Sequence, residues 1–99
     1  MKKIAFLATM IAAATSFNAS AFDVDAKYKQ TCSICHGMGV AGAPKAFDAA
    51  AWAPRIETGM DKMVASVNNG KGAMPPKGLC NDCTDDQYKA LIKHMAKSQ

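Results

Sequence analysis

Residues 32–36 read Cys32-Ser33-Ile34-Cys35-His36, and the other features of the chain are best understood from this segment. It has the form C-x-x-C-H, which is typical of covalent haem attachment. Two thiols at this spacing can reach the two vinyl groups on one side of a porphyrin, and the next histidine then falls under the iron. The segment predicts one haem c, bound covalently through Cys32 and Cys35, with His36 as an axial ligand.

Two alternative roles for these cysteines are consistent with the sequence. Cys32 and Cys35 could form a thioredoxin-like redox pair, although no βαβ pattern surrounds them. Together with Cys80 and Cys83 they could instead bind zinc as a Cys₄ site. However, 44 residues lie between the two pairs, against about 15–20 in a zinc ribbon. Zinc would also leave His36 without a role.

The second axial ligand is predicted in the segment Gly72-Ala73-Met74-Pro75-Pro76. Pro75 favours an extended backbone at Met74, and the two prolines stiffen the loop, so the loop can present a thioether to iron. Met38 is held on the proximal side by its closeness to His36. Three further methionines are expected to pack on apolar helix faces: Met60, Met63 and Met95. The alternative for Met74 is an ordinary apolar loop residue.

A haem iron bound by both His36 and Met74 has no open position. The thioether favours Fe(II) and raises the reduction potential relative to two histidines. We therefore predict a one-electron carrier and not an enzyme. The rival is a haem enzyme whose sixth ligand can be displaced by peroxide or a small gas. His94 is predicted to flank the apolar face of the last helix and not to ligate iron.

The first residues have the layout of a cleaved secretory signal peptide. A basic start, Met1-Lys2-Lys3, precedes an apolar run and the small residues Ala19-Ser20-Ala21. The apolar run has roughly 12 residues, whereas a membrane anchor needs about 20. We expect a signal peptide at 1–21, a single cytochrome c domain at 22–99 and a periplasmic location.

The predicted domain is small enough to need a staple, which the haem and a disulfide can provide. Thr84 follows Cys83 where a second haem site would need histidine, so a Cys80–Cys83 disulfide is the simplest outcome in an oxidising compartment. Without Lys2 and Lys3 the formal charge falls from +4 to +2. No basic run with interleaved aromatic residues is present, so the sequence gives no support for nucleic-acid binding.

The pattern of residues 22–99 predicts an all-α fold of four to five short helices. The first is expected from about Val24 through Cys35, ending at Gly37. The second begins after Asp48 and is limited by Pro54.

The third predicted helix carries the apolar stripe of residues 60–67 and ends at residues 68–70. The last follows a capping box, Thr84 to Gln87, and has one apolar face. That face comprises Tyr88, Leu91, Ile92 and Met95.

With these motifs in place, the chain resembles cytochrome c5, a subgroup of the class I cytochromes c. The resemblance covers essentially all of residues 22–99, and the close Cys80/Cys83 pair is its most distinctive mark. It rests on residues 32–36, Gly39-Val40-Ala41-Gly42-Ala43-Pro44, Ala51-Trp52-Ala53-Pro54-Arg55-Ile56, and 69–78 (Asn69-Gly70-Lys71-Gly72-Ala73-Met74-Pro75-Pro76-Lys77-Gly78). Leu79 departs from the family, which often has glycine there.

The resemblance implies a cytochrome c fold whose first and last helices cross near the haem. It implies His36 and Met74 as axial ligands, and the Cys80–Cys83 disulfide. It also implies that the Pro44 carbonyl accepts a hydrogen bond from the proximal imidazole. Trp52 and Arg55 are expected at the haem propionates, or else in packing and in solvent respectively.

For partners, the resemblance implies a donor and an acceptor protein in a respiratory chain that ends in a terminal oxidase or reductase. Encounters with membrane-bound complexes are therefore possible. Three lysines near the expected haem edge could steer acidic partners, or be ordinary solvated lysines: Lys45, Lys71 and Lys77.

Overall fold

The computed structural model describes residues 22–98, and the predicted signal peptide at 1–21 lies outside them. Within this range five α-helices and two 3₁₀ turns follow one another, which confirms the predicted all-α class. They are α1 (Val24–Gln30), α2 (Ser33–His36), η1 (Val40–Gly42), α3 (Ala49–Ile56), α4 (Met60–Asn69), η2 (Pro76–Leu79) and α5 (Asp85–Ala96). No helix among residues 22–98 has the length and apolar character needed to cross a bilayer.

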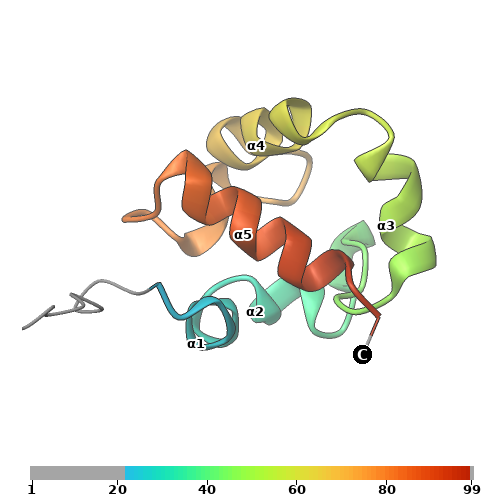
Figure 1. Cartoon of the computed structure of the whole chain (residues 1–99), viewed down its shortest axis with the longest axis horizontal. Helices are drawn as coiled ribbons and strands as arrows, with labels where there is room; N and C mark the ends of the chain where they lie inside the picture. The colour runs from blue at the N-terminus through green and yellow to red at the C-terminus, as the bar shows by residue number, and fades with distance from the viewer. Residues whose placement is uncertain (1–21, 99) are drawn as a thin grey trace, which may run out of the picture.

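The last helix, α5, lies at the centre of the fold, with α4 and α1 packed on either side of it (Figure 1). Its predicted apolar face is buried, and Leu91 is only 1% exposed. Met63, Val64 and Val67 of α4 and Tyr28 of α1 complete the core. The predicted contact between the first and last helices is therefore present.

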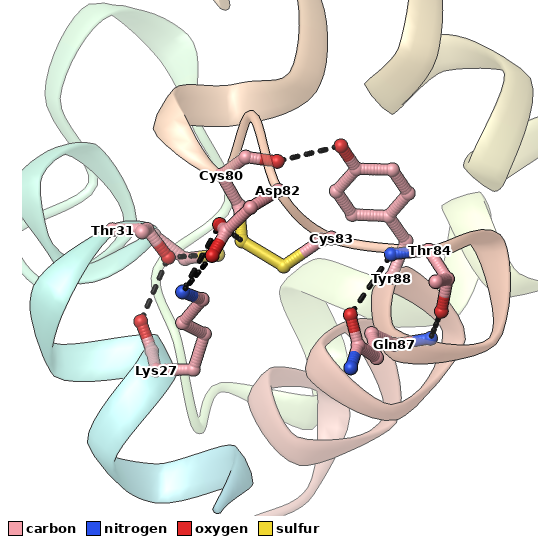
Figure 2. Close-up of polar contacts among 9 residues, drawn as sticks. Lys27, Thr31, Cys80, Asp82, Cys83, Thr84, Gln87 and Tyr88 are labelled. Carbon is pink, nitrogen blue, oxygen red and sulfur yellow. Dashed lines mark hydrogen bonds and ion pairs between the residues drawn. A yellow bond between two sulfur atoms is a disulfide. The ribbon is translucent and has the colours of Figure 1, made fainter. Parts of the chain in front are cut away.

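Two of the predicted helix starts are confirmed by their hydrogen bonds. The Thr84 hydroxyl accepts from the backbone N–H of Gln87 at 3.2 Å, and the Gln87 side chain accepts from the Thr84 N–H at 2.9 Å (Figure 2). Asp48 accepts from the N–H of Ala51 at 3.2 Å and begins α3. Each such cap stabilises its helix by about 1 kcal/mol.

The prediction of one continuous first helix is wrong, because α1 ends at Gln30 and α2 begins only at Ser33. Thr31 has φ −126° and ψ −78°, outside the helical region. Its hydroxyl donates to the Lys27 carbonyl at 2.8 Å, so the side chain satisfies a helix-end carbonyl locally. This break separates α1 from residues 32–36.

The prediction that Pro54 limits the second helix is also wrong, since α3 continues past it to Ile56. Proline lacks the N–H that would bond the carbonyl four residues earlier, on Ala50. Both Pro54 and Ala50 are exposed, so water can reach that carbonyl. The helix therefore tolerates the missing bond.

Candidate functional site

A cavity of about 760 Å³ lies among α2, α3, α4, α5 and the loop that precedes η2. Its volume falls within the range of about 300–1,000 Å³ that is usual for ligand pockets. Buried apolar side chains form much of its wall: Trp52, Met63, Val67, Ile92 and Met95. The cavity brings together three of the predicted site residues, Cys35, His36 and Met74.

The ring of His36 is held in one orientation. His36 is 7% exposed, and its Nδ1 lies 2.8 Å from the carbonyl oxygen of Pro44. A carbonyl can only accept, so Nδ1 carries the proton and Nε2 keeps its lone pair. This confirms the expected hydrogen bond between His36 and the Pro44 carbonyl, and it leaves the Nε2 lone pair available to bind a metal.

The surroundings of His36 favour its neutral form. Burial is the largest effect and lowers the pKa of His36 below its ordinary 6.5. The hydrogen bond to Pro44 acts in the opposite direction, and the charge of Arg55 adds to the lowering. Neutral imidazole is the form that binds metal ions, so this environment is compatible with a ligand role for His36.

Trp52 holds the same side of the cavity. Its indole N–H donates to the carbonyl of Lys45 at 2.9 Å, next to the Pro44 carbonyl that His36 uses. The two ring centroids lie 5.3 Å apart with an interplanar angle of 35°. Since its one N–H is already used by Lys45, Trp52 has no donor left for a propionate. Its position against His36 agrees with the expectation that it packs in the core.

Cys32 and Cys35 are both unpaired thiols. Cys32 is half-buried against the core, and burial raises the pKa of its thiol. Cys80 and Cys83 instead form the predicted disulfide, with their Cα atoms 5.5 Å apart (Figure 2). The disulfide removes two of the four thiolates that the alternative zinc site required, so a Cys₄ site is excluded.

Met74 reaches the cavity from a fixed backbone. Its N–H donates to the Lys71 carbonyl at 2.9 Å, and its carbonyl accepts from the Lys71 N–H at 3.0 Å. These two bonds form the isolated bridge between the two residues. The side chain is half-buried and lies on the cavity wall. Met60 does not line the cavity, whereas Met63 and Met95 do so from the core.

The charged groups on the cavity wall are all basic. Of the described residues that line it, Arg55, Lys62 and Lys71 are cations, and none is acidic. Arg55 uses one N–H on the Ala51 carbonyl at 2.9 Å, which leaves its other donors free for a ligand. An anionic group bound in this cavity would therefore meet compensating positive charge.

His94 lies away from this cavity, as predicted. Its ring packs edge-on against Tyr28 and Phe47, with centroids 5.4 and 5.2 Å away. Its Nε2 is 3.3 Å from a carboxylate oxygen of Asp25. His94 thus joins α5 to α1 and takes no part in the candidate site.

The groups gathered here fit haem c. On the cavity wall they comprise an imidazole with a free Nε2, a thioether on a rigid loop, and the free thiol of Cys35. The second free thiol of the C-x-x-C pair, Cys32, does not line the cavity. These are the groups by which c-type cytochromes hold their cofactor. The apolar side chains of the wall suit the porphyrin ring, and its basic side chains suit the two propionate carboxylates.

Two supports of the site were not predicted from the sequence. Gly78 is buried beside the methyl group of Met74, and Tyr88 donates a hydrogen bond to the carbonyl of Cys80. The only sequence signal was the clustering of glycine and proline in residues 70–78. That clustering indicates a constrained loop but not the atoms it contacts.

Comparisons with known proteins agree with this geometry. A family profile described as cytochrome c oxidase, cbb3-type, subunit III, matches residues 19–95. Cytochrome c5 of Azotobacter vinelandii is 49% identical over 76 residues, covering 75% of this chain and 88% of that protein. Cytochrome c5 of Ectopseudomonas mendocina is 47% identical over 79 residues, covering 78% and 87%.

Solved structures give the same result. A mono-heme ferrocytochrome c from Shewanella putrefaciens is similar with a TM-score of 0.69 and 51% identity, over 79% of this chain and 96% of that one. A chain in an electron transfer complex of nitrite reductase with cytochrome c has a TM-score of 0.65 and 40% identity. The match covers 73% of this chain and 88% of that one.

Proposed function

Because the chain belongs to the cytochrome c5 family of c-type cytochromes, we propose that it is a periplasmic one-electron carrier with a His/Met-ligated, low-spin haem. Its cofactor is haem c. The observation that carries the proposal is that His36, whose Nε2 is free, and Met74 line the same cavity.

Four residues would hold the cofactor. Cys32 and Cys35 would bind it through thioethers, and His36 and Met74 would be the axial ligands. When bound, the haem supplies an iron that changes by one electron between Fe(II) and Fe(III). Arg55 lines the cavity and has N–H donors that no acceptor among residues 22–98 uses, so it is the favoured partner for a propionate.

Rigid ligands suit electron transfer. The His36 ring is fixed by Pro44 and Trp52, and the Met74 backbone is fixed by Lys71. Ligands that are already in place need little rearrangement when the charge of the metal changes. The same closed ligation leaves no position for peroxide or a gas, which favours a carrier over an enzyme.

The surface near the attachment segment fits brief contacts with redox partners. Ile34 and Met38 are 61% and 81% exposed. Lys45, Lys71 and Lys77 are also exposed, and Lys71 lines the cavity, so these cations add positive charge to the surface. We expect a donor and an acceptor protein, the acceptor being an oxidase or reductase. The similarity to a cytochrome c in complex with nitrite reductase supports the reductase class.

The periplasmic location rests on residues 1–21, whose basic, apolar and small-residue segments match a secretory signal peptide. Haem attachment requires reduced thiols at Cys32 and Cys35, whereas Cys80–Cys83 is oxidised. A stable disulfide fits an oxidising compartment. N-terminal sequencing of the mature protein tests the expected cleavage after Ala21.

The ligand assignment is tested by Met74→Ala, with Met60→Ala as the matched control. Met60 is a partly buried methionine of α4 that does not line the cavity. In the ferric holoprotein, Met74→Ala should abolish the Met–Fe(III) charge-transfer band, lower the potential and admit cyanide. Met60→Ala should keep all three properties. A Met74→Ala protein with unchanged spectrum and potential would remove the assignment.

A further inference from the structure

The backbone of Met74 is fixed on both of its polar groups by Lys71. Fixing the backbone does not fix the thioether, because three side-chain bonds of methionine still rotate. Something must therefore hold the end of the side chain if the sulfur is to meet the iron in one orientation.

Gly78 provides the space for that end. It is buried and has φ +54°, and a Cβ added to it would lie 2.8 Å from Cε of Met74. The next atom that such a Cβ would meet, Cγ1 of Val67, is 3.9 Å away. The methyl group of Met74 therefore occupies room that exists because residue 78 has no side chain.

Gly78 is not free to retreat from the methyl group. Its N–H donates to the Pro75 carbonyl at 3.0 Å, and the N–H of Cys80 donates to the Lys77 carbonyl at 2.9 Å. The Cys80 carbonyl in turn accepts a hydrogen bond from the buried Tyr88 hydroxyl. Hydrogen bonds on both sides of Gly78 thus hold its backbone in place beside the methyl group. The bond from Tyr88 anchors this part of the loop to α5.

We infer that Gly78 is a positioning residue for the iron ligand. Its missing side chain forms a seat for the Met74 methyl group, and the seat directs the sulfur toward the cavity. The inference rests on the proposed function. A methyl group at residue 78 would displace the flexible end of Met74, so it would disturb ligation more than folding.

The test compares Gly78→Ala with Gly59→Ala in the holoprotein. Gly59 precedes α4, has φ +105° and does not line the cavity, and a Cβ there would meet no atom within 4 Å. Both variants therefore place alanine at positive φ, and only Gly78→Ala crowds Met74. We expect a weakened charge-transfer band in Gly78→Ala alone. Cyanide should displace Met74 about tenfold more easily in it than in Gly59→Ala.

A second measurement needs no variant. In NMR spectra of the reduced wild-type protein, the Met74 methyl protons should give cross-peaks to the α protons of Gly78. Absent cross-peaks, or equal spectra and cyanide affinities in the two alanine variants, would overturn the inference. If the wild-type protein has the charge-transfer band in that case, His/Met ligation survives. A wild-type protein without the band would remove both.

Discussion

Tyr88, in α5, donates its hydroxyl to the carbonyl oxygen of Cys80 across 2.7 Å in the buried core (Figure 2). Tyr88 is 2% exposed and Cys80 is 1% exposed, so water does not compete for this bond. The bond joins the central helix to the disulfide, and through η2 to the loop that carries Met74. The bond therefore links the buried core to the loop that carries the proposed ligand.

Replacing Tyr88 by phenylalanine would leave the buried Cys80 carbonyl without its donor. Such a loss costs about 1–3 kcal/mol, so Tyr88→Phe should lower the free energy of unfolding by that amount in denaturant titrations. Tyr28→Phe is the matched control, because none of the hydrogen bonds found in residues 22–98 uses the Tyr28 hydroxyl. Equal stability losses in the two variants would contradict the importance of this bond.

The ionisation of Asp82 should make the stability of the fold depend on pH in the acid range. A hydrogen bond from Lys27, 3.1 Å away, lowers the pKa of Asp82 below its ordinary 3.8. A lowered folded-state pKa means that the carboxylate stabilises the fold above pH 3.8. This contribution disappears as the pH falls through the folded value.

The wild-type protein should thus exceed Asp82→Asn in stability near neutral pH, and the difference should shrink below pH 3.8. Unfolding measured from pH 6 to pH 2.5 tests this expectation. Glu57→Gln, at an exposed carboxylate, should not reproduce it. Because the ion pair lies at the surface, the difference should be small and should fall further in high salt.

Leu79 lies in a backbone region that favours glycine, with φ +67°. A side chain in this region costs about 1–2 kcal/mol, and Leu79 is 47% exposed, so it returns little of this through burial. Leu79→Gly should raise the free energy of unfolding by about 1 kcal/mol. Leu79→Ala keeps the strain and should not raise stability. If Leu79→Ala raised the free energy of unfolding as much as Leu79→Gly, the result would contradict this reasoning.

Three exposed lysines, Lys45, Lys71 and Lys77, should act on association rates. Reversing charge in Lys45→Glu, Lys71→Glu or Lys77→Glu should slow electron transfer with an acidic partner at low salt, and added salt should reduce the difference. Stopped-flow kinetics over a range of ionic strength measures this effect. Lys93→Glu, on α5, is the control. Rates independent of salt would show that these lysines are ordinary solvated side chains.

Local signals in the sequence predicted much of this structure. The Thr84 capping box, the Asp48 cap and the apolar stripe of α4 each depend on residues within one or two turns. The C-x-x-C-H pattern and the Met74 loop are also local signals, because each is a short segment with its own chemistry. They predicted that His36 and Met74 belong to one site, and both residues line the cavity.

The remaining features depend on contacts that a pattern does not contain. The break at Thr31 requires its hydroxyl to bond Lys27, and α3 passes Pro54 because the chain is exposed there. The contact between Gly78 and Met74 needs three-dimensional packing, in which a missing side chain makes the room. Sequence periodicity records neither solvent access nor empty space.

The central claim is that one iron in a covalently attached haem is bound by His36 and Met74. A redox titration of the mature holoprotein, followed at the Met–Fe(III) charge-transfer band, tests it most directly. The account predicts a single one-electron transition in which the band is present in the oxidised protein and vanishes on reduction. A colourless protein, or an oxidised protein that lacks the band and binds cyanide as an open site does, would contradict it.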